Sequence, residues 1–298
     1  MHPVLAWNGW APASPCTPDC LPAGPAPQVG RLRVALRTVR LVAALAVTVA
    51  GVPFLPRRAR ERWLRAGSRA VLRAAGVRLR ITGAAGYAAP GSGALVVANH
   101  MSWVDILAVE AVSPVRMLAK REVRDWPVIG WVAERSGALF VDRAGLHALP
   151  STVAATADVL RGGEVVGVFP EGTTWCGSAA GTFRRAAFQA AIDAGVPVRP
   201  VALRFSTRDP AFVGDQTLLD SLMRVVRMRG VECELTVLPP LPPCADRREL
   251  ARLASDAIAW VTGVRHGVEP VPAGTTPAAA VPAAPVPAEP AYAPAAAA

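Results

Sequence analysis

The sequence predicts an α/β domain with a largely parallel sheet flanked by helices, preceded by an N-terminal helical membrane hairpin. Three observations predict this architecture. A basic, then apolar, then basic segment comes early in the chain. From Val77 onward, short β-branched runs alternate with amphipathic helical patterns, as expected for strands joined by helices. Polar clusters directly follow three of those runs, at the strand ends where ligand sites of such sheets gather.

The two ends of the chain have compositions that do not favour a packed core. Residues 1–29 are rich in Pro, Ala and Gly, and residues 266–298 are a Pro/Ala/Val repeat with almost no charge. Such segments bury too little apolar surface to offset the entropy lost on ordering. We therefore expect a disordered leader at 1–29, membrane-associating helices at 30–76, an α/β domain at 77–265 and a disordered tail at 266–298.

The early apolar segment is Leu41–Leu55, an uncharged run shorter than the roughly 20 residues needed to span a bilayer. Arginines crowd both of its flanks, at Arg31, Arg33, Arg37 and Arg40 before it and at Arg57, Arg58, Arg60, Arg62 and Arg65 after it. Basic flanks stay on the cytoplasmic side of a membrane. This favours a monotopic attachment, as a short hairpin broken at Pro53 and Pro56, over a true span or a buried core helix.

The net charge of +10, from 32 Lys+Arg against 22 Asp+Glu, suits nucleic acid, an anionic membrane or phosphorylated substrates. The arginines crowd the apolar segment, and no zinc-finger spacing, aromatic-basic RNA motif or basic heptad region occurs. The cytoplasmic membrane surface is therefore the expected partner, and nucleic acid is not. Among five irregularly spaced cysteines, Cys16 and Cys20 lack the second ligand pair that a zinc site needs, so we expect reduced thiols and no metal.

Seven β-branched runs are expected to form the strands: 77–82, 94–99, 115–120, 138–143, 164–170, 196–205 and 232–238. Amphipathic patterns at 151–161 and 183–194 are typical of the helices between them. Pro197 and Pro200 favour an edge position for the sixth strand, because proline cannot donate to a ladder.

The motif NHMSWVD follows the second of these strands and contains the best candidates for catalysis. His100 sits in the turn before a helix, where Asp105 can hold one imidazole nitrogen and leave the other free to act as a base. A structural interpretation competes with this one. Ser102 with Asp105 three residues later also matches a helix capping box.

Two further clusters follow strands. Asp142 and Arg143 end the fourth, where an arginine can bind a phosphate or simply form a surface pair. The stretch VFPEGTTWCG ends the fifth. Its Gly172 and Thr173 can bind an anion, and Glu171 can orient a substrate hydroxyl or pair with Arg143. The same residues also suit a plain strand-terminating turn.

Together the clusters resemble the glycerolipid acyltransferase family, whose pattern has four blocks in fixed order. The chain supplies NHMSWVD at 99–105, FVDR at 140–143, FPEGT at 169–173 and VPVRP at 196–200. The segment AKREVRDWPVIGW at 119–131 also resembles the family's linker between the first two blocks. The resemblance covers about Val77–Val237, and its four ordered blocks make chance agreement improbable.

The resemblance implies a role for each matching residue. His100 matches the general base that takes a proton from the acceptor hydroxyl, and Asp105 matches the residue that orients the base. Substrate binding is implied for Asn99, Lys120, Arg143, Glu171, Gly172 and Thr173, with Arg143 on the acceptor phosphate and Lys120 near the reacting carbonyl. The family uses no metal or redox cofactor and takes its acyl group from acyl-CoA or acyl-acyl carrier protein.

The implied reaction is O-acylation of lysophosphatidic acid to phosphatidic acid at the cytoplasmic face of the cell membrane. One departure weakens that choice of acceptor: the family's third block reads FPEGTR, whereas Thr174 stands here in place of the arginine. The FPEGTT form resembles members that acylate other lysolipids, so lyso-ornithine lipid is the alternative acceptor. Arg184 and Arg185 are candidates to replace the missing charge. A lipid-binding protein without catalysis is the competing class, and it would be expected to lack His100, Asp105 or Glu171.

Overall fold

The computed structural model describes residues 14–24, 26–142, 148–242 and 244–267. Its elements, in chain order, are η1 (Pro18–Cys20), α1 (Arg31–Gly51), η2 (Val52–Phe54), α2 (Arg57–Ala75), β1 (Val77–Gly83), β2 (Ala94–Ala98), α3 (Trp103–Val112), β3 (Arg116–Lys120), η3 (Arg121–Asp125), α4 (Ile129–Ser136), β4 (Leu139–Val141), α5 (Leu149–Arg161), β5 (Val165–Val168), α6 (Ala186–Ala194), β6 (Val198–Phe205), α7 (Leu218–Arg227), β7 (Val231–Val237) and α8 (Arg247–Thr262).

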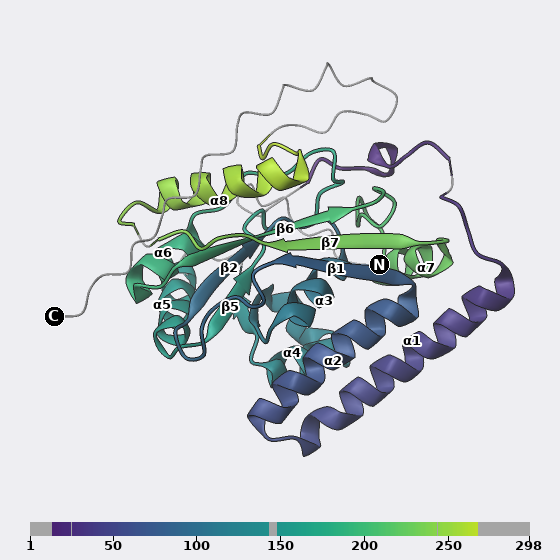
Figure 1. Cartoon of the computed structure of the whole chain (residues 1–298), viewed down its shortest axis with the longest axis horizontal. Coiled ribbons are helices and arrows are strands. Elements are labelled where there is room, and N and C mark those ends of the chain that lie inside the picture. Colours follow the sequence, from purple (N-terminus) through teal and green to yellow (C-terminus); the bar gives the residue numbers. More distant parts are fainter. Residues whose placement is uncertain (1–13, 25, 143–147, 243, 268–298) are drawn as a thin grey trace.

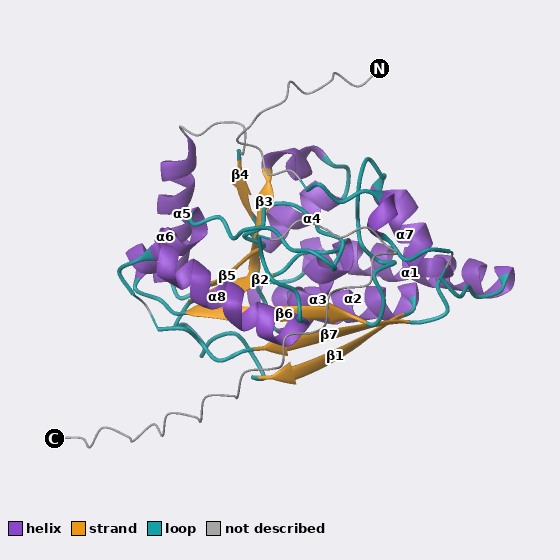
Figure 2. Ribbon diagram, turned by 90° about the horizontal axis from the view of Figure 1, so that it is seen from above, coloured by secondary structure: helices purple, strands orange, loops and turns teal. Residues whose placement is uncertain are grey.

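The described strands form one mixed sheet in the order β1-β7-β6-β2-β5-β3-β4. All neighbouring strands are parallel except β6 and β7, so the predicted largely parallel sheet is confirmed. Each strand lies in one of the seven predicted runs, give or take a residue at the ends. The sheet twists strongly, and Figure 2 shows β4 at one edge running steeply across the direction of β1 at the other.

The predicted edge position of β6 is wrong, because β6 lies between β7 and β2. Pro200 is accommodated at the point where the ladder to β7 begins. That ladder starts one residue later, with Val201 opposite Val237, while the Pro200 carbonyl accepts a hydrogen bond from the Leu238 amide at 3.0 Å. The missing proline N–H therefore falls at the end of the ladder, where few pairings are lost.

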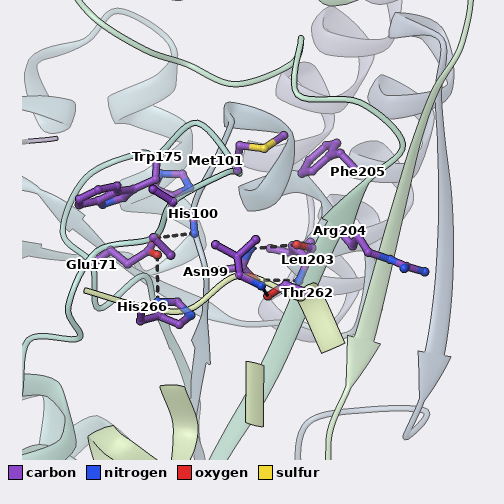
Figure 3. A pocket seen from close by; sticks show the side chains of 14 residues that line it. Asn99, His100, Met101, Glu171, Trp175, Leu203, Arg204, Phe205, Thr262 and His266 are labelled. Atoms are coloured by element: carbon purple, nitrogen blue, oxygen red, sulfur yellow. Dashed lines mark hydrogen bonds and ion pairs between the residues drawn. The ribbon is translucent and has the colours of Figure 1, made fainter. Parts of the chain in front are cut away.

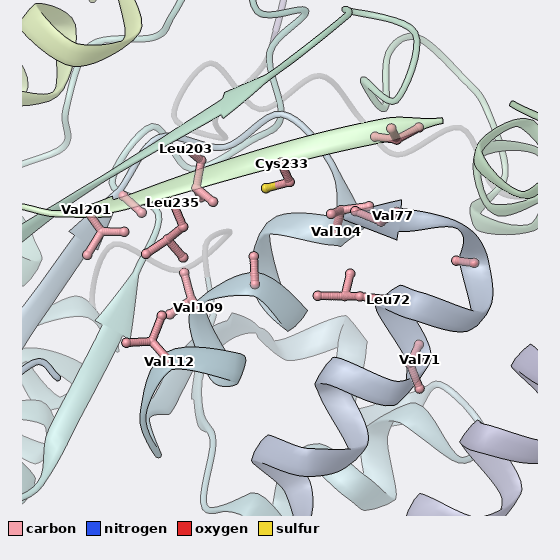
Figure 4. Packing of buried hydrophobic residues seen from close by; sticks show 14 of the residues in the cluster. Val71, Leu72, Val77, Val104, Val109, Val112, Val201, Leu203, Cys233 and Leu235 are labelled. Carbon is pink, nitrogen blue, oxygen red and sulfur yellow. The ribbon is translucent and has the colours of Figure 1, made fainter. Parts of the chain in front are cut away.

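Two apolar cores lie on opposite faces of the sheet, and β2 contributes to both. Val96 and Ala98 face the core shared with α2, α3 and α7, whereas Leu95 and Val97 face the core shared with α5, α6 and α8. This alternation explains why all of β2 is buried and reads as a continuous apolar run. Figure 1 shows the helices on the two sides of the sheet, and Figure 4 shows the first core, with Leu72, Val104 and Leu235 packed between helices and strands.

Helices α1 and α2 pack against each other as the predicted hairpin and extend beyond the sheet. The contact is close because Gly67 has no side chain where the Thr48 side chain lies, and the Trp63 indole donates to the Thr48 carbonyl at 2.9 Å. Arg37 anchors the hairpin to the domain through the carbonyls of Val226 and Met228, at 2.9 and 2.6 Å.

The outer side of α1 is apolar and exposed, with Leu32, Leu36, Val39, Val42, Leu45 and Val47 each at least two fifths exposed. By length and composition, Arg31–Phe54 is the one helical segment of the described residues that can cross a membrane, with a mean hydropathy of 1.7. It is longer than the uncharged run because the arginines before Leu41 belong to the same helix.

Part of the segment predicted as a disordered leader has a defined conformation. Residues 14–24 include η1, and Cys16 and Cys20 are only 2% and 6% exposed. Hydrogen bonds to Cys16 from the amides of Cys176 and Gly214 hold this segment in place. Local composition cannot predict contacts with residues so far along the chain. The remaining predictions of disorder, for residues 1–13 and 268–298, lie outside the described residues.

Candidate active site

The site begins at the carboxyl end of β2, where Asn99 and His100 leave the sheet. The Asn99 side chain bonds both backbone groups of Leu203 in β6: its Nδ2 donates to the carbonyl at 2.9 Å, and its Oδ1 accepts from the amide at 2.8 Å. Asn99 also lines the pocket that contains His100, and its expected role in substrate binding stays a prediction. Asn99 continues the β2–β6 pairing by side chain and so fixes the backbone that carries His100.

Asp105 holds the His100 ring from the first turn of α3. Its Oδ2 lies 2.9 Å from His100 Nδ1 and accepts from the amides of Met101 and Ser102 at 2.6 and 2.7 Å. Ser102 and Asp105 also form the capping box of α3. The predicted capping box is confirmed, and the catalytic interpretation stays a prediction that this geometry allows: the fully buried Asp105 caps the helix and also contacts the histidine.

The remaining ring nitrogen, His100 Nε2, is available for chemistry. The ring stacks on Phe169 at a centroid distance of 4.0 Å, and its side chain stays 16% exposed as part of a pocket wall. Nε2 has no hydrogen-bond partner among the described residues. An imidazole with Nδ1 held by a carboxylate and Nε2 facing a pocket is arranged to accept a proton from a bound molecule.

Glu171 approaches the same histidine from the loop after β5. Its Oε2 accepts from the His100 backbone amide at 2.8 Å, and its Oε1 lies 3.3 Å from Nδ1 of His266 (Figure 3). Both side chains are almost completely buried. Burial raises the pKa of Glu171, while the His266 and His100 contacts oppose that rise. Glu171 therefore fixes the backbone at His100 from the opposite side to Asn99.

His266 is a site residue that the sequence does not predict, and it lies one residue beyond the predicted domain end at 265. Its Nδ1 lies 3.1 Å from the Gly181 carbonyl, its ring packs edge-on against Phe183, and the Gly267 amide donates to Ala180 at 2.7 Å. A lone histidine at the start of a Pro/Ala-rich stretch carries no local signal of such a position. The position of His266 in the site follows from the fold, which brings the residues after α8 back to the loop after Glu171.

The FPEGT turn has the tight geometry that its composition predicts. The Gly172 amide donates to the Phe169 carbonyl at 3.0 Å, and Gly172 has a φ of +80°, which favours glycine. Thr173 follows, half-buried. The Thr174 hydroxyl donates a hydrogen bond to the Phe212 carbonyl at 2.6 Å. The Trp175 amide donates to the His100 carbonyl at 2.8 Å. The turn thus holds the His100 segment by backbone contacts.

The other expected site residues are placed elsewhere or lie outside the described residues. The Lys120 ammonium sits over the Trp126 ring, 5.4 Å from its centroid, and Lys120 does not line the His100 pocket. Arg184 and Arg185 are exposed and do not line it either. Arg143 lies outside the described residues, so its role stays a prediction.

The pocket that contains His100 is a hollow with a mostly apolar lining between β2, β6, the loop after β5 and the residues after α8 (Figure 3). Of the described residues that line it, Arg204 is the one with a permanent positive charge, and its guanidinium is paired with Glu234 at 2.5 Å. The pocket offers the partly exposed His100 ring, whose Nε2 is unpartnered in the described part of the chain, beside the buried carboxylates of Asp105 and Glu171. Such a site is suited to moving a proton from a hydroxyl.

Comparisons with known proteins relate the chain to one family. Residues 78–204 match the family model described as Acyltransferase. The chain is 36% identical over 250 residues to the lyso-ornithine lipid O-acyltransferase of Pseudomonas aeruginosa, covering 77% of this chain and 93% of that protein. It is 38% identical over 144 residues to the 1-acyl-sn-glycerol-3-phosphate acyltransferase of Neisseria gonorrhoeae, covering 46% of this chain and 56% of that protein.

A solved structure has the same fold. The 1-acyl-sn-glycerophosphate acyltransferase PlsC of Thermotoga maritima superimposes with a TM-score of 0.62 at 19% identity, covering 78% of this chain and 96% of that one. The likeness supports the arrangement of sheet and helices described above.

Proposed function

The chain belongs to the acyltransferase family and is an enzyme of the lysophospholipid acyltransferase type, and from this premise we propose that it transfers a fatty acyl group to the hydroxyl of lyso-ornithine lipid. Lysophosphatidic acid, the acceptor first expected from the sequence, is the second candidate. The observation that carries the proposed chemistry is the His100–Asp105 contact, which leaves His100 Nε2 free in a pocket.

In the proposed reaction, His100 Nε2 takes the proton of the acceptor hydroxyl as its oxygen attacks the carbonyl carbon of an acyl thioester. A carbon–oxygen bond forms, the carbon–sulfur bond breaks, and the proton passes from His100 to the departing thiolate. Asp105 accepts from Nδ1–H throughout, which fixes the tautomer and stabilises the imidazolium. No acyl-enzyme and no cofactor is required, and the donor is acyl-CoA or acyl-acyl carrier protein.

Two observations support an ornithine headgroup over a phosphate. The similarity to the lyso-ornithine lipid enzyme extends over nearly the whole of that protein, whereas the match to the lysophosphatidic acid enzyme spans about half of it. The described pocket wall is also poor in free cations, because its one arginine, Arg204, is already paired with Glu234. A phosphate carries more negative charge than the zwitterionic ornithine group and gains more from cations.

The lipid acceptor and the exposed apolar side of α1 support a site of action at a membrane surface. The hairpin packs beside the domain and presents Val39, Val42 and Val47 outward. We propose attachment to the cytoplasmic face of the cell membrane, since the arginines that flank the apolar run favour that side.

A direct competition between acceptors tests the proposal. Purified full-length protein in lipid nanodiscs is given equal surface concentrations of lyso-ornithine lipid and lysophosphatidic acid with one acyl-CoA, and the products are measured by mass spectrometry. We expect kcat/KM to favour lyso-ornithine lipid by at least about tenfold, or roughly 1.4 kcal/mol. Preference for lysophosphatidic acid would overturn the acceptor and leave the acyl transfer intact.

The Thr174→Arg variant sharpens that experiment. It restores the cation that the family pattern has at this position and removes the bond to the Phe212 carbonyl. Because a charge-assisted contact to phosphate contributes about 1.5–3 kcal/mol, the ratio of rates should shift toward lysophosphatidic acid by roughly tenfold or more. His100→Ala supplies the background rate for both acceptors.

A further inference from the structure

Three cysteines from distant parts of the chain meet beside the active site. The sulfurs of Cys16, Cys20 and Cys176 all lie within 4.8 Å of one another. Their side chains are buried, and all are free thiols. Cys16 and Cys20 come from the short segment before α1, and Cys176 comes from the loop after β5. Spacing along the chain does not relate them, because Cys176 lies 160 positions after Cys16.

The cluster has hydrogen bonds directed at its sulfurs, as thiolate ligands have. The Cys176 amide donates to Cys16 Sγ at 3.2 Å, and Cys176 Sγ lies 3.1 Å from Ser178 Oγ. The Gly214 amide also donates to the Cys16 carbonyl at 3.1 Å, which fixes the backbone at Cys16. The sulfurs are therefore held in position by their surroundings.

Apolar packing or a disulfide explains this arrangement less completely. A disulfide would join two of the sulfurs and leave the third buried beside it without a role. A tetrahedral zinc site uses all three, since thiolates bind zinc at about 2.3 Å and neighbouring sulfurs are then about 3.8 Å apart. That separation lies within the observed range of up to 4.8 Å.

We propose that Cys16, Cys20 and Cys176 bind one Zn²⁺ as thiolates, with an oxygen from Ser178 or water in the fourth position. Zinc is the soft cation that structural sites rich in cysteine take up most often. The ion is structural and takes no part in acyl transfer. The expectation of no metal rested on the family resemblance and on Cys16 and Cys20 as a pair without further ligands, whereas the fold adds Cys176 to that pair.

The position of the cluster gives the metal a function. Trp175, which precedes Cys176, donates its amide to the His100 carbonyl, and the Phe212 amide donates to the Met101 carbonyl. Met101 packs in the same apolar cluster as the three cysteines. A zinc ion here joins the segment before the membrane hairpin to the backbone around the catalytic histidine. It therefore couples the position of α1 to the geometry of the site.

Metal content and cobalt substitution test the proposal on the full-length protein in detergent. Purification without chelators should give about one zinc per chain, as expected for a single four-coordinate site. Replacing zinc by Co²⁺ should produce thiolate-to-cobalt charge-transfer absorption and the intense d–d bands of tetrahedral cobalt. Cys16→Ser, Cys20→Ser and Cys176→Ser should each lower the zinc content at least about tenfold, because a structural site needs all its ligands.

Cys244→Ser is the matched control, because Cys244 lies outside the cluster and is partly exposed. It should keep the full zinc content and the cobalt spectrum. The wild-type spectrum does not depend on whether any variant folds, so it decides the question by itself. Wild-type protein that takes up no zinc or cobalt in competition with a chromophoric chelator would overturn the proposal. So would a disulfide between two of the three cysteines in protein purified under reducing conditions.

Discussion

Asp105 holds both the ring of His100 and the backbone that carries it. Its Oδ2 lies 2.9 Å from His100 Nδ1 and also accepts from the amides of Met101 and Ser102. The position of the base therefore depends on the same carboxylate that starts helix α3. Stability and catalysis are coupled at this residue, and suitable variants can separate them.

Asp105→Asn tests that coupling. The asparagine oxygen can still accept from the backbone, but it cannot hold Nδ1–H as a charged partner, so we expect kcat to fall at least about 10²-fold. Asp220→Asn is the control, since Asp220 forms the same capping box with Thr217 at the start of α7, away from the pocket. Both variants should stay folded, because the asparagine oxygen can still accept the backbone hydrogen bonds of the capping box. Equal activity in the two would contradict the role of Asp105.

His266→Phe tests the contact between His266 and Glu171. Phenylalanine keeps the packing against Phe183 but removes the one imidazole partner of Glu171 Oε1. Because the His266 contact opposes the burial that raises the Glu171 pKa, its loss should raise that pKa further and favour the neutral carboxyl. We expect kcat/KM to fall about tenfold with little loss of folded protein, as for one weakened charged hydrogen bond. Unchanged kinetics would mean that His266 only fills space.

The overall fold was largely predictable from the sequence, because the strands are short β-branched runs bounded by turn residues. The His100–Asp105 pair was also predictable, since both residues lie in one short motif. His266 and the three-cysteine cluster were not, because each depends on segments that meet through the fold. His266 contacts Glu171 from the segment after α8, and Cys16 meets Cys176 from 160 positions away in the chain.

Membrane attachment through α1 predicts the effect of charge on its outer side. Val39→Asp with Val42→Asp places two carboxylates on the exposed apolar face, where each charge costs up to about 3 kcal/mol in an apolar environment. We expect binding to vesicles containing anionic lipid, measured by flotation, to fall at least about tenfold. Trp260→Asp, on the exposed side of α8, should bind like the wild type. Equal flotation of the double variant would exclude α1 as the attachment surface.

Glu110 predicts a dependence of stability on pH. Burial, with a contribution from Glu61, raises the pKa of Glu110 to about 8. The folded protein therefore binds this proton more tightly than the unfolded chain, so the contribution to stability is present below about pH 4.5 and is lost as pH rises through 8. Glu110→Gln should flatten the fall in Tm between pH 5 and 8. A Tm profile parallel to that of the wild type would contradict the prediction.

The rate of thioester consumption by His100→Ala, with the wild type beside it and lysolipid present, tests the central claim most directly. If His100 Nε2 is the base, the rate should fall at least about 10²-fold while the circular dichroism spectrum and Tm stay close to those of the wild type. A folded His100→Ala protein that keeps more than about a tenth of the wild-type rate would contradict the account, because general base catalysis contributes more than that.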